Sequence, residues 1–485
     1  MRLKPEVAAL SLAVLFTLPV LAQMSVGVSA PRGEPVKLTF KPPAGRLSSI
    51  TGRPYAATET LEQTLPNGTH LTLSSTVLAR DSMGRTRTER TIPGAAAGFV
   101  AIEILDPVAG YVYVYDPPHQ TAHRVAASIA TYAAPKMPRP CPAGPAGKTF
   151  GNTRDGITST SESLGRRDIQ GVSACGDRIT QTYPAGSMFG NDRPVSVTSE
   201  TWSAFDELGK MMLSTHSEPR GGGTVSGLKN VQLEEPDAAL FRPPKGYRVV
   251  DETGAFVIEL ARPSTPSPSP QAIPVVTALT GLPYSAEDTL SAEDTLADGT
   301  RFSHAISSTL IYRDPTGRTR KEHLGTASLR YKIEILDAVA GYRYFLDPEK
   351  RIAARTAVQV QLKPAAEASL PSHPTAKPDT EWLGTRTIDG VITYGRRITT
   401  TYAPGTMSGN DRPMVFVDER WTSPQLGTDM ATRSSNPRTG TSISTLKNLK
   451  YGEPDASLFR VPDGYRMVDD PDPGWNVFLH AAAAK

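Results

Sequence analysis

The sequence is poor in the residue types that usually reveal a chemical function. Its 485 residues include only two cysteines and eight histidines, and aromatic residues make up 7% of the chain. The G-x-S-x-G and P-loop signatures are absent, so the sequence gives no evidence for the hydrolases or nucleotide-binding enzymes that carry them. The 52 basic and 49 acidic residues leave a net charge of +3, which is too balanced to indicate nucleic acid or an anionic membrane surface as a partner.

Long apolar runs are also missing, with one exception at the N-terminus. Arg2 and Lys4 precede an apolar run over residues 7–21, and residues 20–22 (Val-Leu-Ala) supply the small side chains that a signal peptidase accepts. A membrane anchor is the alternative, but the run is shorter than the roughly 20 residues that span a bilayer. We therefore expect residues 1–22 to be a cleaved signal peptide. The mature protein is then periplasmic or extracellular, with no transmembrane segment.

What the chain does contain is a long internal repeat. The matching segments are collinear: 51–90 with 280–322, 101–117 with 332–348, 169–183 with 388–402, and the pentapeptide GNDRP at 190–194 and 409–413. The unit has about 200 residues, far longer than a solenoid repeat, so each copy should be a complete domain. We predict a first module over 36–252, a Pro/Ser linker over 262–271, a second module over 273–470 and a tail over 471–485.

Both modules end in nearly the same phrase, EPDAALFRPPKGYRVVDE at 235–252 and EPDASLFRVPDGYRMVDD at 453–470. Asp237 is placed to stabilise the first turn of a short helix, since a carboxylate is favourable at a helix N-terminus. The Leu-Phe pair would then pack inward, and P-x-G-Y would turn the chain into a last strand. The phrase predicts a domain-closing element.

The local pattern is typical of strands throughout. Runs such as HLTLSSTVLARD and YVYVYD are rich in Val, Thr and Tyr, and Gly, Pro or Asn separates them from their neighbours. Helical patterns are scarce, the longer candidates being the residues before Leu61 and the stretch Arg124–Tyr132. The expected fold is mainly β (α+β), a large antiparallel sheet with a few short helices. Because exposed edges are a hazard, strong curvature or partial closure is expected.

Three repeated motifs occur in the same order in both copies: the basic hairpins DSMGRTRTER and DPTGRTRKE, the strand pairs EILDPVAGYVYVYDP and EILDAVAGYRYFLDP, and the closing EPD-x-x-LF-x-x-P-x-GY. This order of signals, and above all the closing motif, resembles the lipoprotein-carrier superfamily of LolA and LolB. The resemblance implies two tandem curved half-barrels, each around a helical plug, with an apolar cavity that receives lipid or lipoprotein acyl chains. The chain departs from that family in carrying two modules, Pro-rich insertions and no obvious transfer loop.

The duplication offers an internal test for chemistry, because residues that the module requires should occur in both copies. No histidine has a histidine partner in the other copy, which argues against a shared acid/base or metal site. Cys141 and Cys175 both lie in the first copy, and the sequence leaves open whether they form a disulfide. The paired carboxylates, including Asp192 with Asp411, are better explained as turn or strand residues than as catalytic groups. We expect no cofactor and no metal.

Paired arginines and aromatics are the candidate ligand contacts. Arginine can hold an anionic head group through its bidentate fork, and aromatic side chains can line a cavity. The alternative is cross-strand ion pairing for the arginines and core packing for the aromatics. The candidates are Arg85, Arg178, Tyr113 and Trp202 in the first copy, and Arg318, Arg397, Tyr344 and Trp421 in the second.

Three functional hypotheses follow. The first is a secreted, non-enzymatic binding protein that holds a lipid or another apolar ligand in each half-barrel. The second is a structural or envelope-interaction protein whose barrels are filled by their own side chains. The third, a hydrolase, has the least support in the sequence.

Overall fold

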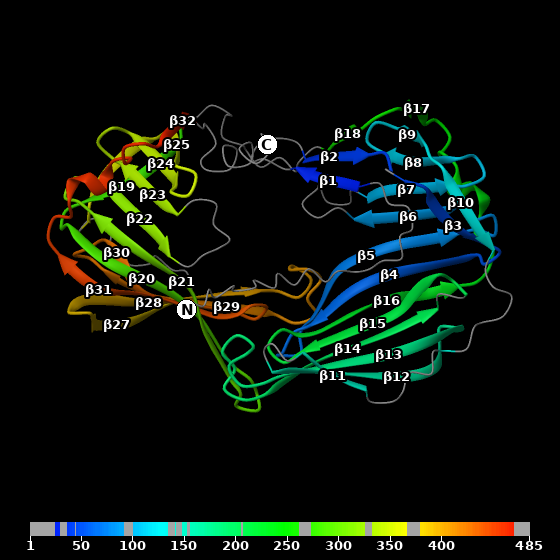
Figure 1. The fold of residues 1–485 in the computed structure, drawn as a ribbon, viewed down its shortest axis with the longest axis horizontal. Helices are drawn as coiled ribbons and strands as arrows, with labels where there is room; N and C mark the ends of the chain where they lie inside the picture. Colours follow the sequence, from blue (N-terminus) through cyan, green and yellow to red (C-terminus); the bar gives the residue numbers. More distant parts are fainter. Residues whose placement is uncertain are drawn as a thin grey trace.

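The computed structural model describes most of the chain and leaves the predicted signal peptide, linker and tail outside the described residues. The described ranges are 25–29, 36–43, 45–91, 100–133, 141, 148–152, 156–204, 207–260, 273–324, 332–365 and 379–469. The chain forms two side-by-side bodies built on large curved sheets (Figure 1).

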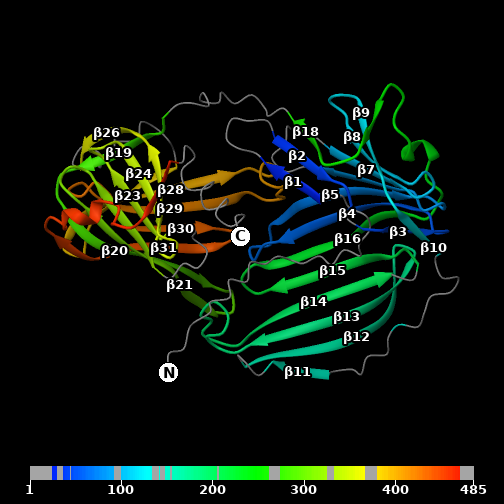
Figure 2. The same ribbon diagram turned by 45° about the horizontal axis from the view of Figure 1, so that its top comes forward.

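The first module is a 13-stranded sheet in which neighbouring strands follow the chain order except at two places, where β16 pairs with β4 and β9 pairs with β17. Neighbouring strands are antiparallel except for the parallel pair β9–β17. Figure 2 shows the succession from β12 to β16 along this sheet. In spatial order the strands are β11 (Lys148–Asn152), β12 (Ile157–Ile169), β13 (Val172–Tyr183), β14 (Val195–Ala204), β15 (Lys210–Glu218), β16 (Gly222–Gln232), β4 (Tyr55–Thr64), β5 (His70–Arg80), β6 (Thr86–Thr91), β7 (Val100–Asp106), β8 (Tyr111–Asp116), β9 (Thr121–Ala126) and β17 (Arg248–Glu252).

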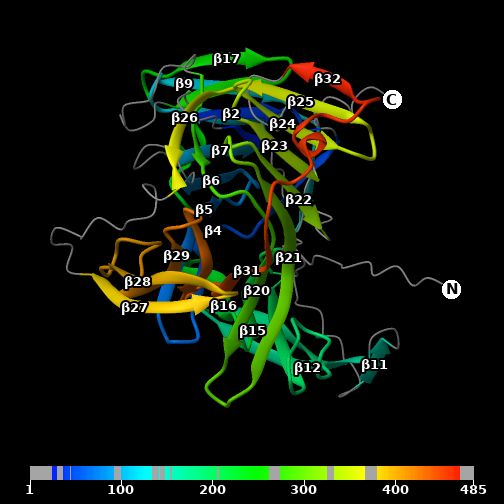
Figure 3. The same ribbon diagram turned by 90° about the vertical axis from the view of Figure 1, so that its left-hand side faces the viewer.

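The second module repeats this topology in 12 strands, with the matching departures from chain order at β31–β20 and at the parallel pair β25–β32. Figure 3 shows β25 and β32 together at the upper edge. The spatial order is β27 (Thr380–Ile388), β28 (Val391–Tyr402), β29 (Met414–Ser423), β30 (Thr428–Asn436), β31 (Gly440–Tyr451), β20 (Tyr284–Thr295), β21 (Arg301–Arg313), β22 (Thr319–Leu324), β23 (Ile333–Asp337), β24 (Tyr342–Asp347), β25 (Ile352–Ala357) and β32 (Arg466–Asp469). The predicted mainly β fold with two tandem half-barrels is confirmed.

Small sheets complete each module. Each has a parallel two-stranded ribbon, β3 (Leu47–Thr51) with β10 (Ile129–Ala133), and β19 (Val275–Thr280) with β26 (Gln359–Pro364). The first module also has a three-stranded sheet of β1 (Ser25–Ser29), β2 (Val36–Lys41) and β18 (Phe256–Leu260). This sheet pairs β2 with two strands that lie outside the predicted range 36–252, β1 before it and β18 after it.

The two faces of the first sheet have different cover. On one face, Leu105, Val112, Val114 and Val125 pack against Leu38 and Phe40 of β2 and against Phe256 and Ile258 of β18. We call this the inner face, because β2 and β18 lie on the side of the sheet that is turned toward the second module (Figure 1). On the outer face, Ile104, Tyr113 and Tyr115 pack against Phe241.

The complete helical elements among the described residues are two 3₁₀ turns, η1 (Ala238–Phe241) and η2 (Ala456–Phe459). Both belong to the repeated closing phrase. The carboxylate of Asp237 accepts a hydrogen bond from the main-chain N–H of Ala239, and the Phe241 side chain is buried. The same contacts recur from Asp455 to Ser457, with Phe459 buried. The phrase thus forms the short turn with an inward-packed phenylalanine that the sequence predicts, and the strand after it, β17 or β32, is the edge strand of each main sheet, although β18 still follows β17 in the first module.

Two other helix predictions are wrong. The residues before Leu61 belong to β4, and the stretch Arg124–Tyr132 is divided between β9 and β10. Ala56, Ala57 and Glu59 favour helix at the first site, but β4 is held between β5 and β16, and such tertiary pairing overrides weak local propensity. The expected helical plug is likewise replaced, on the inner face of the first module, by strands β2 and β18.

A buried arginine supports the same corner of each module. Arg80 donates to the carbonyl oxygens of Arg53 and Leu208, and its guanidinium lies 4.9 Å from the centre of the Tyr55 ring. Burial lowers the pKa of this arginine, because the charged form loses hydration. Arg313 repeats the arrangement, donating to the carbonyls of Leu282 and Leu426.

The two cysteines form a disulfide in the structure. Cys141 and Cys175 have Cα atoms 5.5 Å apart and are separated by 34 positions in the chain. Cys175 lies on β13, so the bond ties the segment that precedes β11 back to the main sheet. The second module has Tyr394 at the position of Cys175 and folds with the same strand order. The bond is therefore a feature of the first module alone.

Candidate functional site

The arginines that the sequence singles out are ion-paired within their own modules. Arg85 lies 2.5 Å from a carboxylate oxygen of Asp81, and its guanidinium stacks over the Phe241 ring. Arg318 makes the same contacts with Asp314 and Phe459. These pairs brace the basic hairpin against the closing 3₁₀ turn.

The second pair of arginines lies on the outer face. Arg178 bridges Glu200 on β14 and Glu162 on β12, with N–O distances of 2.6 and 3.0 Å. The strand register places Arg178, Glu200 and Val225 in one row that continues to Glu62 of β4. This is the side of the sheet that faces η1, opposite the inner face.

Arg397 repeats this arrangement in the second module, where it bridges Glu419 and Glu381. Its hydrogen bond to Glu419 raises the pKa of the Arg397 guanidinium, and Glu200 does the same for Arg178. The structure thus places both arginines in cross-strand ion pairs.

The predicted aromatic residues pack inside their modules. Trp202 is buried beside Gly176, and the guanidinium of Arg167 stacks 4.2 Å from its ring. Trp421 has the matching contacts with Gly395 and Arg386. Tyr113 belongs to the core that contains Phe241, while Tyr344 packs against the core around Ile335 in the second module. All eight predicted residues therefore have close partners within their own module.

A different row of residues marks the inner face of the second module. Trp382, Arg396 and Arg420 are directly opposite one another on β27, β28 and β29, so their side chains share a face. The row continues through Thr432 and Ser444 to Leu290 of β20. Glu381, Arg397 and Glu419 occupy the opposite, outer face. Trp382 and Arg420 are accessible, with 38% of the tryptophan and 45% of the arginine side chain exposed.

The two arginines of this row are less fully paired than those on the outer face. Nη1 of Arg420 lies 3.4 Å from the Asp429 carboxylate, which is a long contact for an ion pair. Nε of Arg396 is buried and has no hydrogen-bond partner among the described residues. The accessible donors that the row offers to a ligand are therefore those of the half-exposed Arg420. We call this row of residues the Trp-Arg row.

The first module does not share the Trp-Arg row. The register places Ser163, Asp177 and Thr201 at the matching positions. The sequence analysis missed the row because it sought residues common to both copies, whereas this row is present in one. A search of the aligned copies for positions at which one copy has an arginine or a tryptophan and the other does not would have found it.

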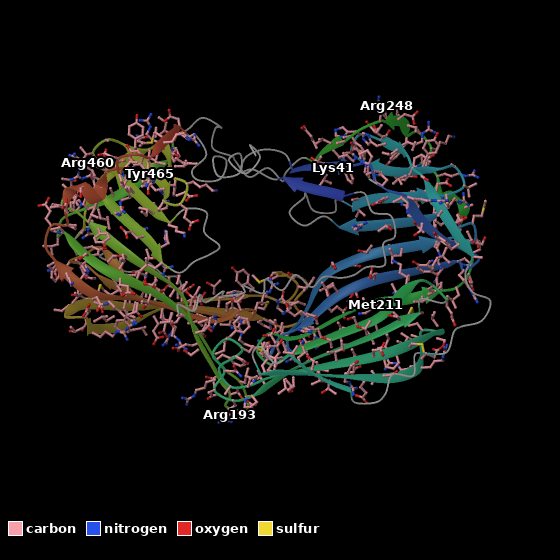
Figure 4. All side chains as sticks on the ribbon, in the orientation of Figure 1. Lys41, Arg193, Met211, Arg248, Arg460 and Tyr465 are labelled. Atoms are coloured by element: carbon pink, nitrogen blue, oxygen red, sulfur yellow. A yellow bond between two sulfur atoms is a disulfide. The ribbon has the colours of Figure 1, made fainter. Side chains whose placement is uncertain are left out.

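A polar cleft lies at the edge of the first module, between β9, β17 and β18. Its volume is about 530 Å³, and its lining includes Asp116, His119, His123, Arg248 and Glu259. His119 contacts Asp116 at 2.7 Å, and His123 contacts Glu252 at the same distance. Figure 4 labels Arg248 at this edge. His119 and His123 have no counterparts in the second module.

Known proteins resemble the chain in fold alone. No family model matches the sequence, and no curated protein is similar to it. Among solved structures, an uncharacterised conserved protein from Thermus thermophilus is 11% identical, with a TM-score of 0.24, and the match covers 39% of this chain and 91% of that one.

Two further matches are described as lipoproteins or lipoprotein-sorting proteins. An outer membrane lipoprotein-sorting protein domain from Vibrio parahaemolyticus is 8% identical, with a TM-score of 0.16, over 37% of this chain and 89% of that one. The Mycobacterium tuberculosis lipoprotein LppX is 12% identical, also at 0.16, over 38% of this chain and 91% of that one. Among the described residues, no helix is both long and apolar enough to cross a bilayer.

Proposed function

We propose that this is an exported, non-catalytic binding protein that holds an anionic amphiphile against the inner face of its second module. The observation that carries the proposal is the Trp-Arg row, in which an exposed tryptophan adjoins two incompletely paired arginines on a curved sheet. An amphiphile with an acidic head group and an apolar tail matches this combination.

The chemistry of the row supports that class of ligand. A guanidinium binds a phosphate or carboxylate through two parallel hydrogen bonds, and two neighbouring arginines can share one head group. The indole of Trp382 offers a flat apolar surface beside them, as tryptophan does at the boundary between head groups and acyl chains. Each methylene that leaves water adds about 0.8 kcal/mol to binding. No covalent step is required.

The first module favours a different role, because its inner face is already covered. Leu38 and Phe40 of β2 and Ile258 of β18 pack against the sheet at the place where a ligand would lie. This observation supports the second hypothesis, a self-filled barrel, for the first module. We therefore restrict the first hypothesis, a ligand in each half-barrel, to a ligand in the second module alone.

Export is part of the proposal and rests on the N-terminal sequence alone. A basic start, an apolar run and small residues before the expected cleavage point indicate the secretory route. N-terminal sequencing of protein recovered from the cell envelope or the medium should begin at Gln23. A mature chain that still begins at Met1 would contradict this part.

The ligand is best tested with the whole mature protein. Native mass spectrometry of protein purified from the exporting cell should show a bound lipid-sized mass. Binding to vesicles of phosphatidylglycerol should weaken by about 10- to 100-fold in Arg420→Gln, since a charge-assisted hydrogen bond contributes about 1.5–3 kcal/mol. Arg433→Gln is the matched control, because Arg433 lies on the outer face of the adjacent strand and is similarly exposed. Equal binding by the two variants, together with a ligand-free mass, would refute the proposal.

A further inference from the structure

The repeated GNDRP turn joins the two modules. In the first module this turn connects β13 to β14 and meets the β20–β21 hairpin of the second module, at the lower centre of Figure 1. The main-chain N–H of Asp192 donates to the carbonyl of Arg301 at 2.9 Å, and the N–H of Arg301 donates back to the Asp192 carboxylate at 2.9 Å. Figure 4 labels Arg193 in this turn, and its guanidinium reaches the carbonyl of Asp298.

The reciprocal contact is made by the same turn of the second module. The N–H of Asp411 donates to the carbonyl of His70 at 3.1 Å, and the N–H of His70 donates to the Asp411 carboxylate at 2.7 Å. His70 begins β5 as Arg301 begins β21. The GNDRP turn of each module therefore binds the hairpin of the other module. Each contact uses the same four groups: the N–H and carboxylate of the aspartate, and the N–H and carbonyl of the hairpin residue.

Each turn is prepared for this contact by a buried asparagine. The side chain of Asn191 accepts from the N–H of Met188 and donates to the carbonyls of Pro184 and Arg193. Asn410 makes the three matching hydrogen bonds. Both asparagines are buried, with only 1% of their surface exposed. The asparagine fixes the turn, which leaves the following aspartate free to face the other module.

Apolar contact accompanies the hydrogen bonds. Leu65 and Leu71 of the first hairpin form one buried cluster with Met414 of β29, and Met407 of the second turn packs on it. At the other contact, the Phe189 ring lies 5.2 Å from the His304 ring and 4.2 Å from the Arg220 guanidinium. The two contacts between the modules thus share their main-chain hydrogen bonds and differ in their side-chain packing.

We propose that the GNDRP turn is a docking device through which the module recognises a second copy of itself, so that the chain is a dimer of modules fused into one polypeptide. An interface is isologous when the turn of each partner contacts the hairpin of the other, and such an interface closes around a two-fold axis. Such an interface holds the modules together without the linker. The linker then only raises their effective concentration.

The recognition is tolerant of sequence on the hairpin side. Each aspartate meets a main-chain N–H and a main-chain carbonyl, so His70 and Arg301 are interchangeable as partners. The docking therefore requires the aspartate and the asparagine-built turn, both present in each copy. The partner that fits this surface is any module with a free hairpin of the same kind, including a module of a second chain.

The test uses the full chain with a site-specific protease sequence inserted into residues 262–270. After cleavage, size-exclusion chromatography with light scattering should still show one particle near 52.0 kDa at micromolar concentration. The Asp192→Ala/Asp411→Ala double variant should fall apart into two particles of about half that mass. Asp237→Ala/Asp455→Ala is the matched control, because these equivalent aspartates also accept a main-chain N–H in a repeated turn but lie outside the contacts between the modules.

Two results would overturn the proposal. The first is separation of the wild-type halves once the linker is cut. The second is a double variant that stays as one particle like the wild type, while circular dichroism shows that it is folded. If the proposal holds, cleaved first modules should also pair with one another after they are separated from the second.

Discussion

A glycine pair in the docking turns gives the sharpest test of the interface geometry. Gly190 and Gly409 are equivalent residues with φ angles of +67° and +62°, a conformation that disfavours any side chain. Their surroundings differ. A Cβ atom on Gly190 would lie 1.9 Å from the carbonyl oxygen of Ser303, whereas one on Gly409 would come no nearer than 3.7 Å to Thr72. Only the first substitution places a methyl group against the backbone of the other module.

The expected magnitudes separate the two effects. Alanine in the left-handed conformation costs about 1–2 kcal/mol at either position. At Gly190 the hairpin must also retreat, which removes the two hydrogen bonds between Asp192 and Arg301 at about 0.5–1.5 kcal/mol each. Gly190→Ala should therefore weaken module docking by a further 1–3 kcal/mol or so, about 5- to 150-fold in the dissociation constant.

The assay is dissociation of the linker-cleaved protein on dilution, measured for both variants. Urea unfolding of each uncleaved variant supplies the control for strain within the turn, which should be similar in the two. Gly190→Ala should dissociate at a much higher concentration than Gly409→Ala. Equal dissociation constants would refute the reasoning, because the close approach of Ser303 would then have no energetic consequence.

Two further predictions concern single features of the chain. Burial lowers the pKa of His304 below its usual 6.5, and Arg220 adds to this, so the docked state binds fewer protons. Docking should therefore be strongest above about pH 6.5 and weaken as the pH falls through the lowered pKa, and His304→Leu should reduce this loss in the dilution assay. Burial raises the pKa of Asp294, whose protonation in more acidic solution acts in the opposite direction. Reduction of the Cys141–Cys175 bond should destabilise the first module by about 3–4 kcal/mol and leave the unfolding of the second unchanged, as differential scanning calorimetry can show.

The local structure and the duplication can be predicted from the sequence, but the face of the sheet on which a side chain lies is harder to predict. The closing phrase predicts its own geometry, since a cap aspartate, a buried Phe241 and the following strand β17 all follow from local rules. The side that Arg178 occupies depends on the register of four strands and on bulges within them. Such bulges shift alternation by one residue, so a binding face cannot be assigned from period-two patterns alone.

The interface was beyond sequence reasoning for another reason. Asp192 and Asp411 are visible as a repeated pair, yet their partners are backbone groups of His70 and Arg301, which have no common side chain. Main-chain recognition leaves no covarying residue on the partner side. The buried Arg80 escaped notice in the same way, because carbonyl oxygens surround it in place of a carboxylate.

Two adjacent residues of β28, Arg396 and Arg397, show how a comparison of the copies distinguishes residues that the fold requires from residues specific to one module. Arg397 has the counterpart Arg178 and makes the same ion pairs on the outer face, so agreement between the copies here reflects the fold. Its neighbour Arg396 replaces Asp177 and points to the inner face, which the ion pairs of the framework do not constrain. A change from carboxylate to guanidinium at one strand position reverses the charge offered to a ligand while the sheet stays the same. Functional residues of such a fused dimer should therefore be sought where its two copies differ on the inner face.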